Sequence, residues 1–283
     1  MAQILKGTAV AEAITQDLLK RSERLKELHC EPTLAIVRMG HREDDESYRR
    51  GIMKRCEKAG IAVREYSISE DDPRNSLMNI IRLVNADPDI HGCLVFRPLP
   101  DKSLDDLAAL LLNPAKDVDS MTMESKVLVY SGKGQGFYPC TAQAVIEICR
   151  FYGIELSGKA VTVLGRSEVI GKPVSLMLQK GNATVTMCHS KTKDLKSVCL
   201  GADIIVSSMG RARIVKSDWV ADGAVLIDVG INFDENGKMC GDFDPEGAED
   251  RDITYTPVPG GVGSVTSTVL AMHVIEAAEK DRS

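Results

Sequence analysis

Short apolar runs alternate along the chain with stretches whose apolar residues fall at helical spacing. In the first half, strand-like runs at 34–37, 61–68 and 93–96 alternate with helical stretches at 48–59, 77–84 and 104–112. The second half repeats this rhythm, with strand-like runs at 160–164, 183–187, 203–206 and 225–228. Strands that alternate with helices predict parallel sheets covered on both faces. We therefore expect an α/β protein with two doubly wound units.

The chain length and one glycine-rich stretch predict two domains. At roughly 150 residues per domain, 283 residues correspond to about two. The most glycine-rich segment, 131–136, precedes Pro139 and a helical stretch near Thr141, which favours a boundary near residue 140. A final helical stretch runs from 264 to 280, and its periodicity alone does not decide which domain it joins.

Composition excludes several classes of protein. The net charge of -6 argues against a general binder of nucleic acids or membrane surfaces, which needs a basic face. With 43% hydrophobic and 27% charged residues, the chain has the composition of a soluble globular protein. No apolar run approaches the roughly 20 residues of a membrane span. The N-terminus lacks the apolar core of a signal peptide, so we expect a cytoplasmic location.

The cysteines do not predict a metal centre. The eight cysteines are Cys30, Cys56, Cys93, Cys140, Cys149, Cys188, Cys199 and Cys240. No two of them are three residues apart, whereas a zinc site needs clustered pairs of ligands. We therefore expect no metal site and eight free thiols in a reducing compartment.

One strand runs directly into a turn that suits phosphate binding. Residues 161–164 lead into Gly165-Arg-Ser-Glu-Val-Ile-Gly-Lys-Pro173, where Pro173 suits the first turn of a helix. Such a turn presents free backbone N–H groups and the positive end of the helix dipole. The full G-x-G-x-x-G pattern is absent, because the next glycine is Gly171. Taken alone, the turn fits an ordinary strand-to-helix connection as well as a phosphate site.

The end of the next strand favours NADP over NAD. An NAD site usually has a carboxylate at this corner, which binds the ribose. Here the strand ends in His189-Ser-Lys-Thr192, without a carboxylate. Ser190 and Lys191, together with Arg166, suit a 2′-phosphate. The alternative for Lys191 is a solvated surface charge.

Motifs along nearly the whole chain carry a resemblance to a known family. They are Pro98-Leu-Pro100, Lys116-Asp-Val-Asp119, Pro139-Cys-Thr141, Gly165-Arg-Ser167, His189–Thr192, Ile227–Asn232, Gly241-Asp242 and Thr256–Gly263 with Thr266. With them the chain resembles the FolD family, the methylenetetrahydrofolate dehydrogenase/cyclohydrolase proteins of one-carbon metabolism. The resemblance implies two α/β domains that face across a cleft. It implies a folate/catalytic domain of 1–139 plus 264–283, and a Rossmann-type NADP domain of 140–263 that forms a homodimer.

The same resemblance assigns site residues. The cofactor contacts fall on Gly165, Arg166, Ser167, Ser190 and Ile231, and the substrate contacts fall on Tyr48, Asp119, Pro259, Gly260, Gly261 and Val262. A carboxylate at Asp119 can accept hydrogen bonds from two adjacent N–H groups of a pterin. The alternative role for Asp119 is to cap a turn or a helix. The glycines of the last loop permit close backbone approach to a ligand.

The chain departs from the family at its catalytic position. The family lysine, four residues after Tyr48, is Ile52 here, and the glutamine that partners it is Phe96. The family serine three residues before Tyr48 is Asp45. Residues i and i+4 share a helix face, so Tyr48 and Ile52 are both expected to point toward the cleft. Lys54 lies about 200° around the helix from Ile52 and does not simply take its place.

These departures predict a dehydrogenase with little hydrolase activity. Oxidation of 5,10-methylenetetrahydrofolate to the methenyl compound needs no general base, because the product cation is stabilised by resonance. Hydrolysis of that cation needs proton transfer, and losing such help typically costs about 10²–10⁴-fold. We therefore predict an NADP-dependent enzyme of tetrahydrofolate derivatives whose cyclohydrolase step is weak or absent.

Two alternatives remain at this point. One is a fully bifunctional enzyme that makes 10-formyltetrahydrofolate with another group in place of the lysine. The other is a non-catalytic NADP- or folate-binding protein with a decayed pocket. The presence of Tyr48, Asp119 and the loop at 257–263 argues against the second. Neither alternative involves nucleic acid or a membrane.

Overall fold

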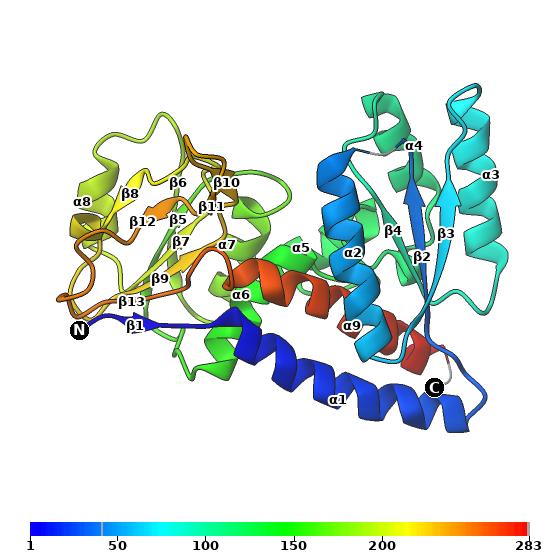
Figure 1. Ribbon diagram of the computed structural model, residues 1–283, viewed down its shortest axis with the longest axis horizontal. Helices are drawn as coiled ribbons and strands as arrows, with labels where there is room; N and C mark the ends of the chain where they lie inside the picture. The colour runs from blue at the N-terminus through cyan, green and yellow to red at the C-terminus, as the bar shows by residue number, and fades with distance from the viewer. Residues whose placement is uncertain (41, 282–283) are drawn as a thin grey trace. The chain divides into compact units, whose positions relative to one another are not determined.

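The computed structural model describes residues 1–40 and 42–281 and divides them into two compact units (Figure 1). Unit 1 comprises Met1–Ala11 and Thr141–Thr266, and unit 2 comprises Glu12–Cys140 and Ser267–Ser283. Two long helices, α1 (Gly7–Glu27) and α9 (Val262–Lys280), each begin in unit 1 and continue into unit 2. Each unit has its own parallel sheet with helices beside it, which confirms the predicted α/β class.

Unit 2 is built on a three-stranded sheet in the order β3-β2-β4, parallel throughout. The strands are β2 (Thr33–Arg38), β3 (Ala62–Ser67) and β4 (Gly92–Val95), and the helices are α2 (Glu43–Lys58), α3 (Pro73–Ala86), α4 (Lys102–Leu111) and α5 (Met123–Ser131), with a 3-10 turn at Pro114–Lys116. Figure 1 shows α2 and α3 on opposite sides of β2 and β3. Residues 33–37 of β2 are all buried, so both faces of this strand are covered, as its continuous apolar run indicates.

Local signals explain where the helices of unit 2 begin. Asp72 accepts a hydrogen bond from the backbone N–H of Asn75, and Pro73 occupies the first turn of α3. Asp101 caps α4 in the same way, with Ser103 as the donor. The buried residues of α3, Leu77, Ile81 and Val84, share one helix face and pack against the sheet. The capping residues thus mark where these helices begin, and the apolar periodicity marks which face is buried.

Unit 1 is built on a six-stranded parallel sheet in the order β1-β13-β9-β7-β5-β6. The strands are β1 (Gln3–Ile4), β5 (Ala160–Leu164), β6 (Thr184–Cys188), β7 (Ile204–Ser207), β9 (Val225–Asp228) and β13 (Thr254–Tyr255). The helices are α6 (Cys140–Phe151), α7 (Gly171–Lys180) and α8 (Leu195–Leu200), with a 3-10 turn at Ser217–Trp219. Short pairs join β8 (Val215–Lys216) to β12 (Phe243–Asp244), and β10 (Asn232–Phe233) to β11 (Met239–Cys240).

The N-terminus departs from the predicted domain boundaries. The sequence placed all of 1–139 in the first domain, but residues 1–11 belong to unit 1, with 141–266. The reason is β1, which pairs in parallel with β13 and so extends the sheet of unit 1. The other two divisions of the chain fall after Cys140 and after Thr266. In the described part of the chain, no helix is long and apolar enough to cross a membrane.

Candidate functional site

The turn between β5 and α7 is folded tightly enough to require glycine. Gly165 has a φ of +121°, and a Cβ there would lie 2.5 Å from the carbonyl oxygen of Ser208. A Cβ at Gly171 would lie 2.3 Å from the carbonyl oxygen of Gly165. The hydroxyl of Ser167 accepts a hydrogen bond from the N–H of Ile170, at 3.1 Å, and so closes the turn. This arrangement brings the backbone of β5, β7 and α7 close together at one end of the sheet.

A pocket of about 310 Å³ opens at this end of the sheet. Its lining residues are Leu164, Gly165, Arg166, Ser167, Cys188, His189, Ser190, Leu195, Ser208, Met209 and Arg211. Four of the five predicted cofactor residues are therefore brought together here. The fifth, Ile231, is not among the lining residues and is 60% exposed, so its role stays a prediction. Lys191 is exposed and also does not line the pocket.

Arg211 lines the pocket although the sequence did not single it out. It follows β7, and its backbone N–H donates to Oδ1 of Asp242 at 2.9 Å. Asp242 is fully buried and also accepts hydrogen bonds from Ser207 and Met209. The loop after β7 is thus fixed by a carboxylate more than thirty residues further along the chain. A basic residue shortly after a parallel strand was the only local signal of this position.

The pocket suits the phosphates of a dinucleotide. Its lining includes two arginines and Ser190 but no Asp or Glu. Arginine and hydroxyl donors bind phosphate oxygens through charge-assisted hydrogen bonds. The carboxyl ends of parallel strands are also the usual ligand-binding edge of such a sheet. The residues present therefore fit a nicotinamide dinucleotide.

Behind this edge lies a buried pair of carboxylates. Asp228 is 2% exposed and accepts hydrogen bonds from the backbone N–H groups of Gly230, Asp242 and Phe243. Burial is the main cause that raises the pKa of Asp228 to about 6, and the charge of Asp242 adds to it. The two carboxylates organise the loops that follow β7 and β9.

In unit 2 the predicted catalytic positions are apolar and closely packed. The rings of Tyr48 and Phe96 lie 5.6 Å apart, centroid to centroid, with an interplanar angle of 38°. Ile52 has no exposed surface, and Phe96 is 5% exposed. Tyr48 is 39% exposed as a residue, but burial of its hydroxyl raises its pKa well above the ordinary value, and the charge of Asp119 raises it further. The sequence led us to expect Ile52 to face an open cleft, whereas the side chain is completely covered.

Asp119 is held on a rigid loop beside these residues. The carboxylate of Asp117, 1% exposed, accepts hydrogen bonds from the backbone N–H groups of Met121 and Thr122 and from the hydroxyl of Ser125. These bonds fix the segment that presents Asp119. Oδ1 of Asp119 accepts the backbone N–H of Cys140, the first residue of α6, at 3.0 Å. Asp119 therefore has the capping role that was its alternative interpretation.

Burial and nearby groups act in opposite directions on the pKa of Asp119. Burial is the main cause that raises the pKa of Asp119, and the hydrogen bonds from Cys140 and the charge of Arg97 partly offset it. Ser120, which the sequence did not single out, has a φ of +58° and a buried hydroxyl with no hydrogen-bond partner among the described residues.

A second pocket, of about 590 Å³, lies at the carboxyl end of the sheet of unit 2, and Phe96, Leu99 and Asp45 contribute to its lining.

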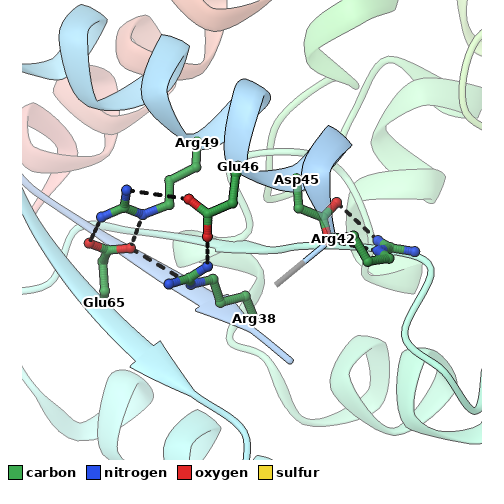
Figure 2. A network of polar contacts seen from close by, with 6 residues as sticks. All are labelled: Arg38, Arg42, Asp45, Glu46, Arg49 and Glu65. Atoms are coloured by element: carbon green, nitrogen blue, oxygen red, sulfur yellow. Dashed lines mark hydrogen bonds and ion pairs between the residues drawn. The ribbon is translucent and has the colours of Figure 1, made fainter. Parts of the chain in front are cut away.

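Asp45 is the third position at which the chain departs from the family, and it forms an ion pair with Arg42 at the N-terminal end of α2. Figure 2 shows the Asp45 carboxylate against the guanidinium of Arg42, with two hydrogen bonds of 2.8 and 3.0 Å. Next to this pair, Arg38, Glu46, Arg49 and Glu65 form a separate group of charged contacts. The charge introduced by Asp45 is therefore balanced locally.

The predicted substrate residues of the last loop belong to the other unit. Pro259, Gly260, Gly261 and Val262 lie in unit 1, whereas Tyr48 and Asp119 lie in unit 2. A Cβ at Gly261 would lie 2.4 Å from the carbonyl oxygen of Pro257. Glycine at this position is thus required by the backbone of the loop itself. The role of these four residues in binding substrate stays a prediction.

The parallel sheet of unit 1, its glycine turn and its phosphate-binding edge define an α/β dinucleotide-binding protein. Comparison with known families gives a more specific result. The model of the tetrahydrofolate dehydrogenase/cyclohydrolase catalytic domain matches residues 5–119, and that of the NAD(P)-binding domain matches residues 139–282. The chain belongs to the tetrahydrofolate dehydrogenase/cyclohydrolase family.

Individual relatives agree with this result over the whole chain. The bifunctional protein FolD of Clostridioides difficile strain 630 is 45% identical over 277 residues, which cover 98% of this chain and 96% of that protein. The crystal structure of the bifunctional enzyme FolD of Campylobacter jejuni superposes with a TM-score of 0.95 at 35% identity, covering 99% of each chain. The Trypanosoma brucei dehydrogenase-cyclohydrolase, solved with NADP and an inhibitor, has a TM-score of 0.91 at 31% identity, covering 99% of this chain and 98% of that one.

Proposed function

We propose that this protein oxidises 5,10-methylenetetrahydrofolate to 5,10-methenyltetrahydrofolate with NADP⁺ and has little or no cyclohydrolase activity. The observation that carries the proposal is the apolar environment at the family's lysine position. Ile52 is completely buried there, and Phe96, with 5% exposure, packs against Tyr48 in place of the partner glutamine. We assign folate binding to unit 2 and NADP binding to unit 1.

The groups needed for the dehydrogenase step are present. NADP⁺, when bound, supplies the hydride acceptor. The backbone N–H of Cys140 holds Asp119 through Oδ1, and a carboxylate has further acceptor sites for the paired N–H groups of a pterin. Tyr48 offers a partly exposed aromatic face for the substrate. Alignment of donor and acceptor is the main task of the protein in such a reaction.

Two ionisable groups of α2 near Ile52, Tyr48 and Lys54, do not suit the proton transfer that hydrolysis needs. A general base near neutral pH needs a pKa near the working pH. The pKa of Tyr48 is raised well above its ordinary value, so this hydroxyl stays protonated. Lys54 is exposed, on another face of α2 from the buried Ile52. Neither Tyr48 nor Lys54 is therefore suited to replace the missing lysine.

The decisive experiment feeds the purified protein 5,10-methenyltetrahydrofolate and follows its hydrolysis. We expect a rate little above that in buffer, while oxidation of the methylene compound proceeds. The double variant Ile52→Lys with Phe96→Gln should recover more hydrolysis than the sum of the two single variants, because the two groups act as a unit. Lys54→Met is the matched control on the same helix and should leave both rates unchanged.

A bifunctional enzyme is the second candidate. The relatives from Clostridioides difficile and Campylobacter jejuni both bear the description bifunctional, and both match nearly the whole chain. If the wild-type protein hydrolyses the methenyl compound as fast as it forms it, this candidate is correct and the lysine is not required. Loss of that hydrolysis in Lys54→Met or Tyr48→Phe would then identify the replacing group.

We also propose NADP in preference to NAD, and a homodimer formed through unit 1. Arg166, Ser190 and Arg211 surround a pocket without an acidic residue, which suits the additional phosphate of NADP. For the homodimer, Phe233 and Met239 are exposed apolar residues of the β10–β11 hairpin of unit 1. Light scattering of the intact chain and of Phe233→Ser tests the dimer, which the substitution should weaken.

A further inference from the structure

The two halves of α2 are held in different ways. In the C-terminal half, Ile52, Cys56 and Ala59 are buried at helical spacing, so apolar contacts anchor this half. In the N-terminal half, none of the residues from 45 to 51 is buried, and Tyr48 is 39% exposed. The N-cap residue, Arg42, makes no capping hydrogen bond with its side chain. Besides the contact of the Tyr48 ring with Phe96, this half of the helix therefore depends on polar anchors.

A ring of four alternating charges supplies this anchor (Figure 2). Arg38, at the end of β2, pairs with Glu46 and lies 3.9 Å from the Glu65 carboxylate on β3. Arg49 pairs with Glu65 through two hydrogen bonds and lies 3.7 Å from Glu46, one turn away on α2. The four side chains are only 13 to 28% exposed. Exposed single ion pairs contribute little, whereas a partly buried closed network holds its members in one geometry.

Gly51 lies between the N-terminal half of α2, which the ion pairs hold, and the C-terminal half, which apolar contacts hold. Glycine is among the least favourable residues inside a helix, because it has the greatest backbone freedom to lose. A Cβ at Gly51 would meet nothing within 4 Å, and its φ is not in the positive range. Neither packing nor backbone conformation requires a glycine here. A glycine between Tyr48 and Ile52 lowers the helix propensity of this turn.

We propose that the ring of Arg38, Glu46, Arg49 and Glu65 positions Tyr48 for folate, and that Gly51 makes this positioning depend on the ring. The four residues are positioning residues, since they act through α2. The ring links α2 to the last residue of β2 and to Glu65 within β3, so it sets how far the first turns of α2 stand from the sheet. The inference rests on the proposed folate site of Tyr48.

Arg38→Met tests the proposal, because it removes the charge that contacts both Glu46 and Glu65 and keeps an unbranched apolar side chain. We expect the KM for methylenetetrahydrofolate to rise about fivefold, a loss at the lower end of the couplings found within one ion-pair network. The kcat and the KM for NADP⁺ should stay within about twofold, because Tyr48 contributes binding shared by the ground state and the transition state. Arg64→Met is the matched control. Arg64 lies on the same strand as Glu65 but pairs with Asp87, so this variant should resemble the wild type.

Adding Gly51→Ala to Arg38→Met should restore most of the lost affinity, since alanine stiffens the helix without a steric cost. Hydrogen exchange should show faster opening of residues 45–51 in Arg38→Met and unchanged exchange in residues 52–58. If Arg38→Met does not fold, Glu46→Gln replaces it, because it removes a charge at nearly constant shape. An unchanged KM for folate overturns the proposal, as does an equal effect of Arg64→Met. A wild-type protein without turnover would instead refute the proposed function, and hydrogen exchange would still test the ring.

Discussion

His273 should make the stability of unit 2 depend on pH. The side chain is 1% exposed on α9 and stacks on Phe137, with ring centroids 4.8 Å apart. Its Nδ1 lies 2.8 Å from the carbonyl oxygen of Val118, so the neutral ring donates a hydrogen bond there. Burial is the main cause that lowers the pKa of His273 to about 4, and the charge of Lys280 lowers it further. Protonation of His273 therefore opposes folding.

The sign and size of this effect follow from the pKa values. Between pH 4 and 6.5 the unfolded chain binds a proton at His273 that the folded chain does not bind. The free energy of unfolding should therefore rise with pH through this window, by up to about 3 kcal/mol for a fall in pKa from 6.5 to about 4. The contribution is complete above about pH 7, and it is lost as the pH falls toward 4.

His273→Asn isolates the titration. The asparagine amide can donate the hydrogen bond to Val118 but does not titrate, so the cost of changing the packing is the same at every pH. Urea unfolding followed by far-UV circular dichroism between pH 4.5 and 8 should show a stability gap between wild type and variant that widens as the pH rises. Trp219, the only tryptophan, lies in unit 1 and reports that unit separately by fluorescence. A gap that stays constant within about 0.5 kcal/mol from pH 5 to 7.5, well below the roughly 2 kcal/mol expected over this part of the titration, would refute the reasoning.

Three further predictions concern two carboxylates, Asp228 and Asp119, and the choice of cofactor. Because the pKa of Asp228 is raised to about 6, the wild type should lose up to about 3 kcal/mol relative to Asp228→Asn as the pH rises from 4 to 7, measured by Trp219 fluorescence in urea. A gap independent of pH would contradict this. Asp119→Asn should leave one pterin N–H unpaired, at a cost of roughly 1–3 kcal/mol, so titration should show weaker folate binding and unchanged NADP⁺ binding. Intact folate binding would limit Asp119 to its capping role. Arg166→Ala should lower kcat/KM for NADP⁺ far more than for NAD⁺, and a wild-type kcat/KM for NAD⁺ that equals the value for NADP⁺ would exclude the proposed preference.

Local sequence was sufficient for the fold class and for the nucleotide-binding turn. Residues 34–37 are completely buried because a central parallel strand is covered on both faces, and a run of four apolar residues already indicates this. Gly165 could be placed at the turn because the strand before it and Pro173 after it bracket the turn within nine residues. The apolar replacement at Ile52 and Phe96 was also visible in the sequence, through the family motif. In each case the signal lies within a few neighbouring residues.

The remaining features depend on contacts between residues far apart in the chain. The strand Gln3–Ile4 is too short to carry a periodic signal, and only its pairing with Thr254–Tyr255 assigns the N-terminus to unit 1. Arg211 reaches the nucleotide pocket because Asp242 holds its backbone. The ring of Arg38, Glu46, Arg49 and Glu65 requires β2 and β3 to lie beside α2, which no local pattern specifies. Periodicity records which face of an element is buried, whereas the partners on that face are decided only when the chain folds.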